Sequence, residues 1–186
     1  TMTIGIIGTG HIGLTTAKVF KAFGAKIIAY DTFENPQAQN ILEYKSLDEV
    51  FAESDLISLH VPLTPQNHHI INAESIAKMK DGVVIVNTAR GGHINTADLR
   101  DALVGGKVAA AGLDVFENEK HLIRKDLSGR IIKDSVYRDL SNFPNVIITP
   151  HVAFNTDIAV QNMVKMSTEN LISFKNAGTT DNEITK

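Results

Sequence analysis

The sequence predicts an α/β domain with a doubly wound parallel sheet of about six strands and helices on both faces. Three observations lead to this prediction. Six short, nearly uninterrupted apolar segments recur along the 186 residues, as expected of parallel strands buried on both faces. Helical periodicity or helix-capping residues separate most of these segments. A glycine-rich turn directly follows the first segment, where such sheets place a ligand.

The apolar segments define the candidate strands. They are residues 4–7, 27–30, 56–61, 83–86, 109–113 and 146–148. A helix is predicted between the first two because apolar residues recur at helical spacing, and Gly24 then acts as a stop signal. Ser46 and Glu49 form a potential capping box, and Asn72 and Asn95 are candidate caps of helices running to residues 79 and 103. A last helix is predicted over residues 156–174.

Two segments depart from this alternation. Residues 120–140 are strongly charged, and we interpret them as an insertion or interface arm rather than as core. Residues 176–186 are polar and predict a linker or tail. The sequence therefore predicts one nucleotide-binding domain over residues 1–175.

Composition excludes several classes of protein. The chain has 21 acidic and 18 basic residues without a basic patch, which argues against nucleic acid as a partner. No apolar run approaches the roughly 20 residues of a membrane helix. The absence of cysteine excludes thiolate zinc sites and suits a reducing compartment, so the cytoplasm is expected. The seven histidines raise a metal alternative, but they form no HxxxH pattern, and no metal site is predicted.

The glycine-rich turn has the pattern GxGxxG, formed by Gly8, Gly10 and Gly13. The first glycine permits the tight turn, the second permits close approach of a pyrophosphate, and the third permits helix and strand to pack closely. Asp31 ends the second predicted strand, where a carboxylate accepts hydrogen bonds from ribose hydroxyls and repels a 2′-phosphate. Together they predict a Rossmann-type domain that binds NAD rather than NADP. The alternative is a turn without a ligand and a solvated Asp31.

Four further segments resemble signatures of the D-isomer-specific 2-hydroxyacid dehydrogenases. They are residues 60–64 (HVPLT), 87–92 (NTARGG), 112–119 (GLDVFENE) and 149–151 (TPH). The resemblance implies that Arg90 binds the substrate carboxylate, that His151 is the acid/base and that Glu119 supports His151. It also implies that Asp114 contacts the nicotinamide end of the cofactor.

Other contacts follow from the same resemblance. Arg90 and His151 are expected to touch the cofactor as well as the substrate. Phe154 is a candidate contact for the substrate side chain, with a core or lid role as the alternative. The remaining cofactor contacts implied are His11, Ile12, His60, Val61, Pro62, Asn67, Thr88 and Ala89.

The chemistry of 2-oxo acid reduction requires residues of these types, independently of the resemblance. Reduction of a 2-oxo acid needs a cation for the carboxylate, and the planar guanidinium of Arg90 suits a two-pronged contact. It also needs a proton donor near neutral pH, which a histidine paired with a carboxylate supplies. Taken singly, Arg90, Glu119 and His151 could each be ordinary surface or capping residues, but jointly this is improbable.

The stretch between Glu119 and His151 narrows the choice within the family. Its length and charge resemble the D-lactate and D-hydroxyisocaproate dehydrogenases more than the phosphoglycerate dehydrogenases. Glu119 argues against the formate dehydrogenases, which carry glutamine there. The expected reaction therefore interconverts a 2-oxo acid and a D-2-hydroxy acid, with pyruvate and D-lactate as the first choice and D-2-hydroxyisocaproate as an alternative.

The resemblance also implies a wider architecture. Family members begin with a substrate domain of about a hundred residues, a typical size for such a domain, which this chain does not contain. We therefore expect the isolated chain to be inactive and expect it to form a homodimer. A non-catalytic NAD-binding module, like the corepressors in the family, is the alternative class of function.

Overall fold

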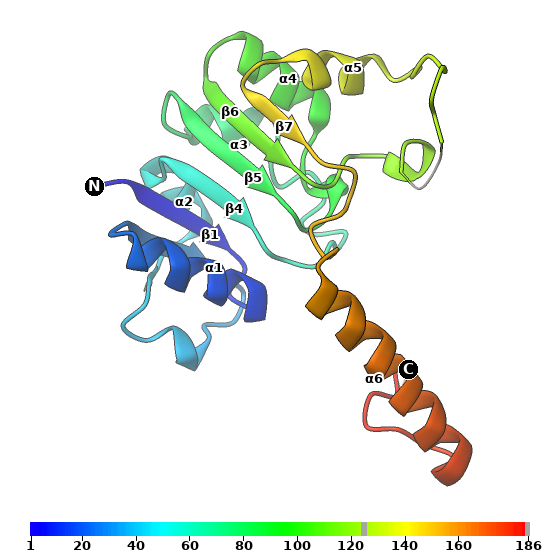
Figure 1. The fold of residues 1–186 in the computed structure, drawn as a ribbon. Helices are drawn as coiled ribbons and strands as arrows, with labels where there is room; N and C mark the ends of the chain where they lie inside the picture. The colour runs from blue at the N-terminus through cyan, green and yellow to red at the C-terminus, as the bar shows by residue number, and fades with distance from the viewer. Residues whose placement is uncertain (124–125, 185–186) are drawn as a thin grey trace. The chain divides into compact units, whose positions relative to one another are not determined.

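The computed structural model describes residues 1–123 and 126–184, and the chain forms two compact units, residues 1–151 and 152–186. The first unit contains a seven-stranded parallel sheet with strand order β3-β2-β1-β4-β5-β6-β7 (Figure 1). Six of the strands match the predicted apolar segments. They are β1 (Thr3–Ile7), β2 (Lys26–Tyr30), β4 (Leu56–Leu59), β5 (Val83–Asn87), β6 (Val108–Leu113) and β7 (Val146–Ile148). The predicted parallel α/β fold is confirmed.

The seventh strand, β3 (Glu43–Tyr44), was not predicted. It is only two residues long and pairs with β2 at the edge of the sheet, where Glu43 stays exposed. A segment this short and polar has no apolar run to reveal it, so only its pairing with Ile28 and Ala29 identifies it as a strand.

Most helices of the first unit begin at the caps found in the sequence. Ser46 and Glu49 form the capping box of α2, while Asn72 and Asn95 accept backbone hydrogen bonds at the starts of α3 and α4. These side chains satisfy N–H groups that otherwise lack partners in the first turn. The helices are α1 (His11–Ala22), α2 (Leu47–Glu53), α3 (Ala73–Lys78), α4 (Thr96–Val104) and α5 (Ser135–Asn142), with short 3-10 turns η1 (Pro36–Ala38), η2 (Gly91–His93) and η3 (Glu119–His121).

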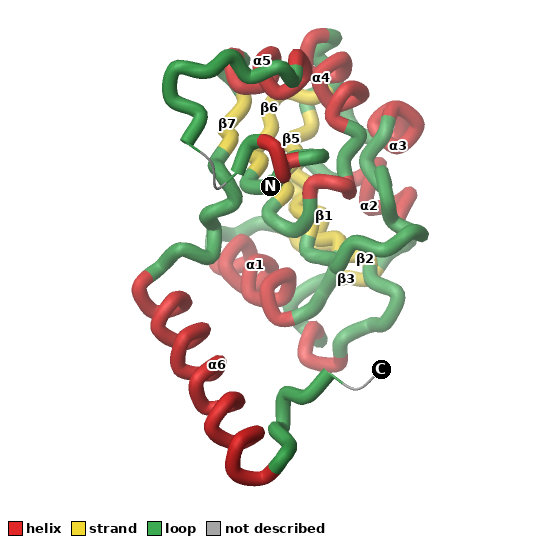
Figure 2. The backbone as a smooth tube through the Cα atoms, turned by 90° about the vertical axis from the view of Figure 1, so that its right-hand side faces the viewer, coloured by secondary structure: helices red, strands yellow, loops and turns green. Residues whose placement is uncertain are grey.

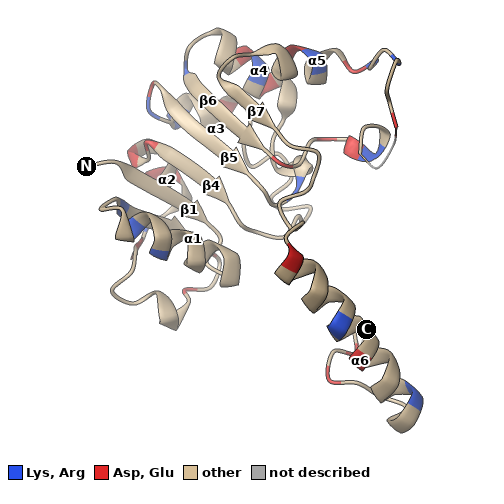
Figure 3. Cartoon of the chain, viewed as in Figure 1, with Lys and Arg blue, Asp and Glu red and all other residues tan. Residues whose placement is uncertain are grey.

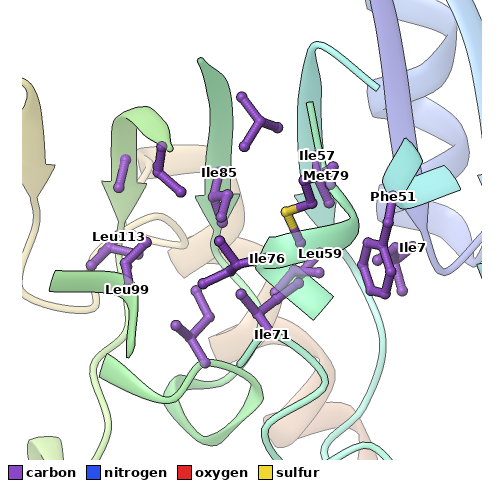
Figure 4. Packing of buried hydrophobic residues seen from close by; sticks show 14 of the residues in the cluster. Ile7, Phe51, Ile57, Leu59, Ile71, Ile76, Met79, Ile85, Leu99 and Leu113 are labelled. Atoms are coloured by element: carbon purple, nitrogen blue, oxygen red, sulfur yellow. The ribbon is translucent and has the colours of Figure 1, made fainter. Parts of the chain in front are cut away.

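Apolar side chains are buried on both faces of the sheet. The larger cluster joins the strands to α2, α3, α4 and α5, with Phe51, Ile76 and Leu99 among its members (Figure 4). A smaller cluster on the other face packs Ala17 of α1 against Ile4 and Ile6 of β1. The strands β1, β4, β5, β6 and β7 carry no charged residue. Lys26 begins β2 and Glu43 lies in the edge strand β3, and the other described charged side chains lie on helices and loops (Figure 3).

The interpretation of residues 120–140 as an arm outside the core is wrong for its last part. Residues 135–142 form α5, in which Leu140 is fully buried. Tyr137 packs edge-on against Phe116, with ring centroids 5.0 Å apart. The charged residues of this helix lie on its exposed face. The high proportion of charged residues in the segment therefore did not indicate that its last part forms an amphipathic helix. Residues 124–125 of the segment lie outside the described residues.

The second unit, residues 152–186, contains α6 (Asp157–Ala177) and the short segments before and after it. Thr156 caps the helix, and Gly178 ends it at a φ of 70°. The chain then reverses direction (Figure 2), and Thr180 donates a hydrogen bond to Asn170. Residues 176–177 therefore belong to the helix, and part of the predicted tail returns to it. Among the described helices, none is long and apolar enough to cross a bilayer.

Candidate dinucleotide and catalytic site

The predicted site residues of the first unit follow the carboxyl ends of its strands. Gly8 follows β1, Asp31 follows β2, His60 follows β4, Arg90 comes shortly after β5, and Asp114 follows β6. Because the sheet is parallel, all of these ends lie at one edge. The neighbours β1 and β4 mark the point where the connections run in opposite directions, which is where open α/β sheets bind ligands.

The glycine turn has the geometry that its pattern predicts. Gly8 has a φ of 97°, and a Cβ atom there would lie 2.6 Å from the carbonyl oxygen of His60. A Cβ atom on Gly13 would collide with the carbonyl oxygen of Gly8, so the third glycine lets α1 pack against the turn. By contrast, a Cβ atom on Gly10 would meet nothing within 4 Å. Open space therefore lies beside the amino end of α1.

Asp31 is held by Thr9 of the glycine turn. Its Oδ2 accepts hydrogen bonds from the Thr9 amide at 2.6 Å and from the Thr9 hydroxyl at 3.0 Å. Burial raises the pKa of Asp31, but hydrogen bonds from Thr9 and from the amides of Phe33 and Thr32 more than offset it, so the pKa lies below its ordinary value. The carboxylate is therefore ionised at neutral pH.

Thr9, Asn35 and Tyr44 form a supporting network that the sequence did not reveal. Thr9 is buried, and its hydroxyl accepts a hydrogen bond from Tyr44 at 2.8 Å. The side-chain amide of Asn35 donates to the carbonyl oxygen of Thr9 at 2.8 Å. The backbone amide of Asn35 donates to the Tyr44 hydroxyl at 2.7 Å. This network fixes the turn against β3.

His60 packs against the glycine turn. Its amide donates to the carbonyl oxygen of Ile7 at 2.7 Å, and its Nε2 lies 2.9 Å from the Ser58 hydroxyl. Burial lowers the pKa of His60 from 6.5 to about 4, so its ring is neutral at pH 7. His60 is therefore a neutral packing and hydrogen-bonding group, consistent with a cofactor-side rather than an acid/base role.

The loop after His60 carries Val61, Pro62 and Asn67. The Asn67 side chain accepts from the amide of Thr64 and donates to the carbonyl oxygen of Pro62, both at 2.8 Å. His93, which is fully buried, lies with its Nε2 3.0 Å from the carbonyl oxygen of Val61. Sequence analysis missed His93, because nothing in the local pattern shows that its side chain reaches a loop some thirty positions earlier.

A turn after β5 presents Arg90. The buried Asn87 shapes this turn by donating to the carbonyl oxygen of Arg90 at 2.9 Å and accepting from the amide of Ala89 at 3.0 Å. Arg90 is exposed, and within the described residues its guanidinium forms no ion pair with a carboxylate. Thr88 is exposed as well. Arg90 is therefore available to an anionic ligand.

His151 and Glu119 form a direct pair, although they are far apart in the sequence. Nδ1 of His151 lies 2.7 Å from Oε1 of Glu119, and the side chains are only 29% and 18% exposed. The other carboxylate oxygen of Glu119 accepts from the amide of Phe116 at 2.9 Å, and His151 adopts a φ of 55°, which is uncommon for a residue other than glycine. Nδ1 is thus the ring nitrogen that faces the carboxylate, and Nε2 is the other ring nitrogen.

Asp114 and the Arg90 turn complete this end of the site. Asp114 is buried, and its carboxylate accepts a hydrogen bond from the Thr149 hydroxyl at 2.5 Å. Gly91 packs so closely against the carbonyl oxygen of Phe116 that a Cβ atom there would collide with it. The turn of Arg90 therefore lies against the segment that carries Glu119.

Comparison with known proteins decides the family. The model of the D-isomer specific 2-hydroxyacid dehydrogenase NAD binding domain matches residues 1–153. The chain belongs to this family. It is 50% identical to an aromatic 2-oxoacid reductase of Clostridium sporogenes over 98% of the chain and 55% of that protein. It is 46% identical to a D-lactate dehydrogenase of Lactiplantibacillus plantarum over 99% of the chain and 56% of that protein.

Solved structures of the family agree with the fold. A D-lactate dehydrogenase from Treponema pallidum superposes with a TM-score of 0.95 at 43% identity, over all of this chain and 56% of that one. A D-lactate dehydrogenase with NAD+ from Lactobacillus jensenii gives a TM-score of 0.91 at 38% identity, again over 100% and 56%. The chain therefore spans about half the length of these relatives.

The residues of the nucleotide site fit NAD. The open space at Gly10 lies at the amino end of α1, which no side chain caps among the described residues and which suits a pyrophosphate. His11 and Ile12 are exposed there. The ionised Asp31 suits an unphosphorylated ribose. Phe154 belongs to the second unit and is 45% exposed, so its role stays a prediction.

Proposed function

We propose that this chain forms the nucleotide-binding part of an NAD-dependent enzyme that interconverts a 2-oxo acid and a D-2-hydroxy acid. The observation that carries the proposal is the His151–Glu119 pair at the same sheet edge as the exposed Arg90. A domain that only binds NAD has no need of a histidine paired with a carboxylate at the same sheet edge as an exposed arginine that can bind a substrate carboxylate.

Each of the three side chains has a separate task in reduction. Arg90 binds and orients the substrate carboxylate through its planar guanidinium. NADH, which the glycine turn and Asp31 would hold, would supply the hydride that the carbonyl carbon accepts. Nε2 of His151 donates the proton to the carbonyl oxygen, and Glu119 holds the ring in position through its contact with Nδ1. Oxidation of the hydroxy acid uses the same groups in reverse.

We propose pyruvate and D-lactate as the substrate pair, supported by the similarity to D-lactate dehydrogenases. A larger 2-oxo acid, aromatic or branched, is the second candidate, because the Clostridium sporogenes relative is named an aromatic 2-oxoacid reductase. Comparing kcat/KM for pyruvate, phenylpyruvate and 2-oxoisocaproate in the protein that carries this chain separates them. A preference of ten-fold or more for either larger acid would overturn the pyruvate assignment.

The catalytic assignment is tested in the same protein by replacing His151 and Glu119 separately with glutamine. His151→Gln should lower kcat by about a hundred- to ten-thousand-fold while NADH still binds. Glu119→Gln should also lower kcat, because a neutral amide holds Nδ1 of His151 more weakly than a carboxylate does. A kcat in Glu119→Gln equal to that of the parent would contradict the pairing, and NADH binding without turnover in the parent would favour a regulatory module.

A homodimer and a cytoplasmic location remain predictions of this proposal. Within the charged segment, residues 120–123 and 126–134 are the described part outside α5, and we propose them as a contributor to the contact because α5 belongs to the core. The mass of the purified protein in solution, measured at high concentration, tests the dimer, and a strictly monomeric mass would contradict it.

A further inference from the structure

Three metal-ligating side chains outside the nucleotide and catalytic residues meet in the first unit. Nε2 of His69 lies 2.6 Å from Oε1 of Glu117, and the rings of His68 and His69 have centroids 3.8 Å apart. One ligand atom from each of the three residues lies within 4.8 Å of the others. We propose that His68, His69 and Glu117 form a binding site for a divalent transition-metal ion of the zinc class.

The backbone of His69 is fixed from both sides. Its amide donates to the carbonyl oxygen of Gly92 at 2.8 Å, and its carbonyl oxygen accepts from the Asn72 side chain at 2.9 Å. These contacts hold His69 at a φ of 52°, a left-handed conformation that costs energy for a residue with a Cβ atom. The imidazole is thus positioned by tertiary structure rather than left to rotate on a free loop.

The other two ligands are positioned as well. Oε2 of Glu117 accepts a hydrogen bond from the Thr96 hydroxyl at 3.3 Å, which orients the carboxylate in the way that outer-shell partners orient metal ligands. A Cβ atom on Gly92 would lie 3.4 Å from Cδ2 of His68, so the ring of His68 lies beside this glycine. The side chains of His69 and Glu117 are 28% and 23% exposed, which limits competition from water.

The donor set selects the class of ion. Two imidazole nitrogens and one carboxylate oxygen suit Zn²⁺, Co²⁺ or Ni²⁺, whereas Mg²⁺ and Ca²⁺ prefer oxygen donors alone. Two ligands about 2.0 Å from one tetrahedral ion lie roughly 3.3 Å apart. The Glu117 oxygen must therefore withdraw slightly from Nε2 of His69, which a small side-chain rotation provides. Water would occupy the fourth position.

The simpler alternative is an ordinary hydrogen-bonded pair between His69 and Glu117. His68 distinguishes the two ideas, because no hydrogen bond of the described structure ties His68 to that pair, while the metal site needs its nitrogen.

The cluster lies close in sequence to two residues of the proposed catalytic set. Glu117 lies two positions before Glu119, and Gly92 lies two positions after Arg90. An ion that draws Glu117 away from His69 would act on the segment that orients Glu119. We therefore expect an occupied site to alter activity, although the binding test does not depend on activity.

The test is titration of the protein with Co²⁺, followed by visible absorbance, and competition of bound Co²⁺ by Zn²⁺. The parent should bind one ion per chain at this site, and His68→Ala should weaken binding at least ten-fold. His68 is exposed, so this variant should fold, which an unchanged thermal unfolding profile in a metal-chelating buffer would verify. Glu117→Gln should weaken binding as well.

His121→Ala is the matched control, because His121 is an exposed histidine outside the cluster. This variant should bind Co²⁺ as the parent does. Equal affinity of the parent and His68→Ala, or no binding by the parent at micromolar Co²⁺, would overturn the proposal and leave His69 and Glu117 as a structural pair.

Discussion

The partly buried His60 should make the stability of this domain depend on pH in a defined interval. Its pKa falls from 6.5 to about 4 because burial disfavours the charged ring. Between these values the unfolded chain binds a proton at His60 and the folded chain does not. The free energy of unfolding therefore falls as the pH is lowered from 6.5 to about 4, and this residue adds no further loss below that.

The expected size follows from the same two values. At 1.36 kcal/mol per pH unit, the drop in pKa corresponds to about 3 kcal/mol of stability. His60→Gln removes the titrating group while keeping an amide near the Ser58 hydroxyl. The difference in free energy of unfolding between parent and variant should therefore change by about 3 kcal/mol between pH 6.5 and 4. This change does not depend on how far the substitution itself lowers the free energy of unfolding at pH 7.

Urea unfolding followed by circular dichroism at several pH values measures this difference. Carboxylates also titrate in the interval, but they contribute to both proteins, so subtraction removes them. His121→Gln, at an exposed position, should leave the slope unchanged. Parallel stability profiles of the parent and His60→Gln would show that His60 is not desolvated and would refute the reasoning.

Three further predictions follow from other parts of the site. Asp31→Asn should weaken NADH binding about ten- to a hundred-fold, because hydrogen bonds to a charged group contribute roughly 1.5–3 kcal/mol. The same variant should reduce the preference for NADH over NADPH. Fluorescence titration with both cofactors measures this, with Glu34→Gln as a control for lost charge nearby. Arg90→Lys in the protein that carries this chain should raise KM and lower kcat in steady-state assays, because lysine keeps the charge but loses the two-pronged geometry. His93→Leu should lower the free energy of unfolding by about 1–3 kcal/mol, measured with urea, because the carbonyl oxygen of Val61 loses its partner.

Each of these predictions has a result that would contradict it. Equal affinity of the parent for NADH and NADPH would remove the role of Asp31 in cofactor choice. Unchanged kinetics in Arg90→Lys would place the substrate carboxylate elsewhere. Unaltered stability in His93→Leu would mean that the contact with Val61 makes no net contribution.

The sequence by itself determined the features that depend on neighbouring residues. Apolar runs located six of the seven strands, and the caps Ser46, Asn72 and Asn95 located the helices that they start. The glycine pattern and Asp31 located the nucleotide turn. These features are local because backbone conformation and the burial period of a strand or helix are encoded within a few residues.

Only the tertiary structure decided which distant groups meet. It joined Glu119 to His151 and Glu117 to His69, and it buried His93 against the loop of Val61. It also made β3 a strand and α5 part of the core, against their polar composition. The physical reason is that the partner of a polar side chain and the burial of a short segment are set by the packing of whole layers. That packing creates contacts between residues with no relation in local pattern.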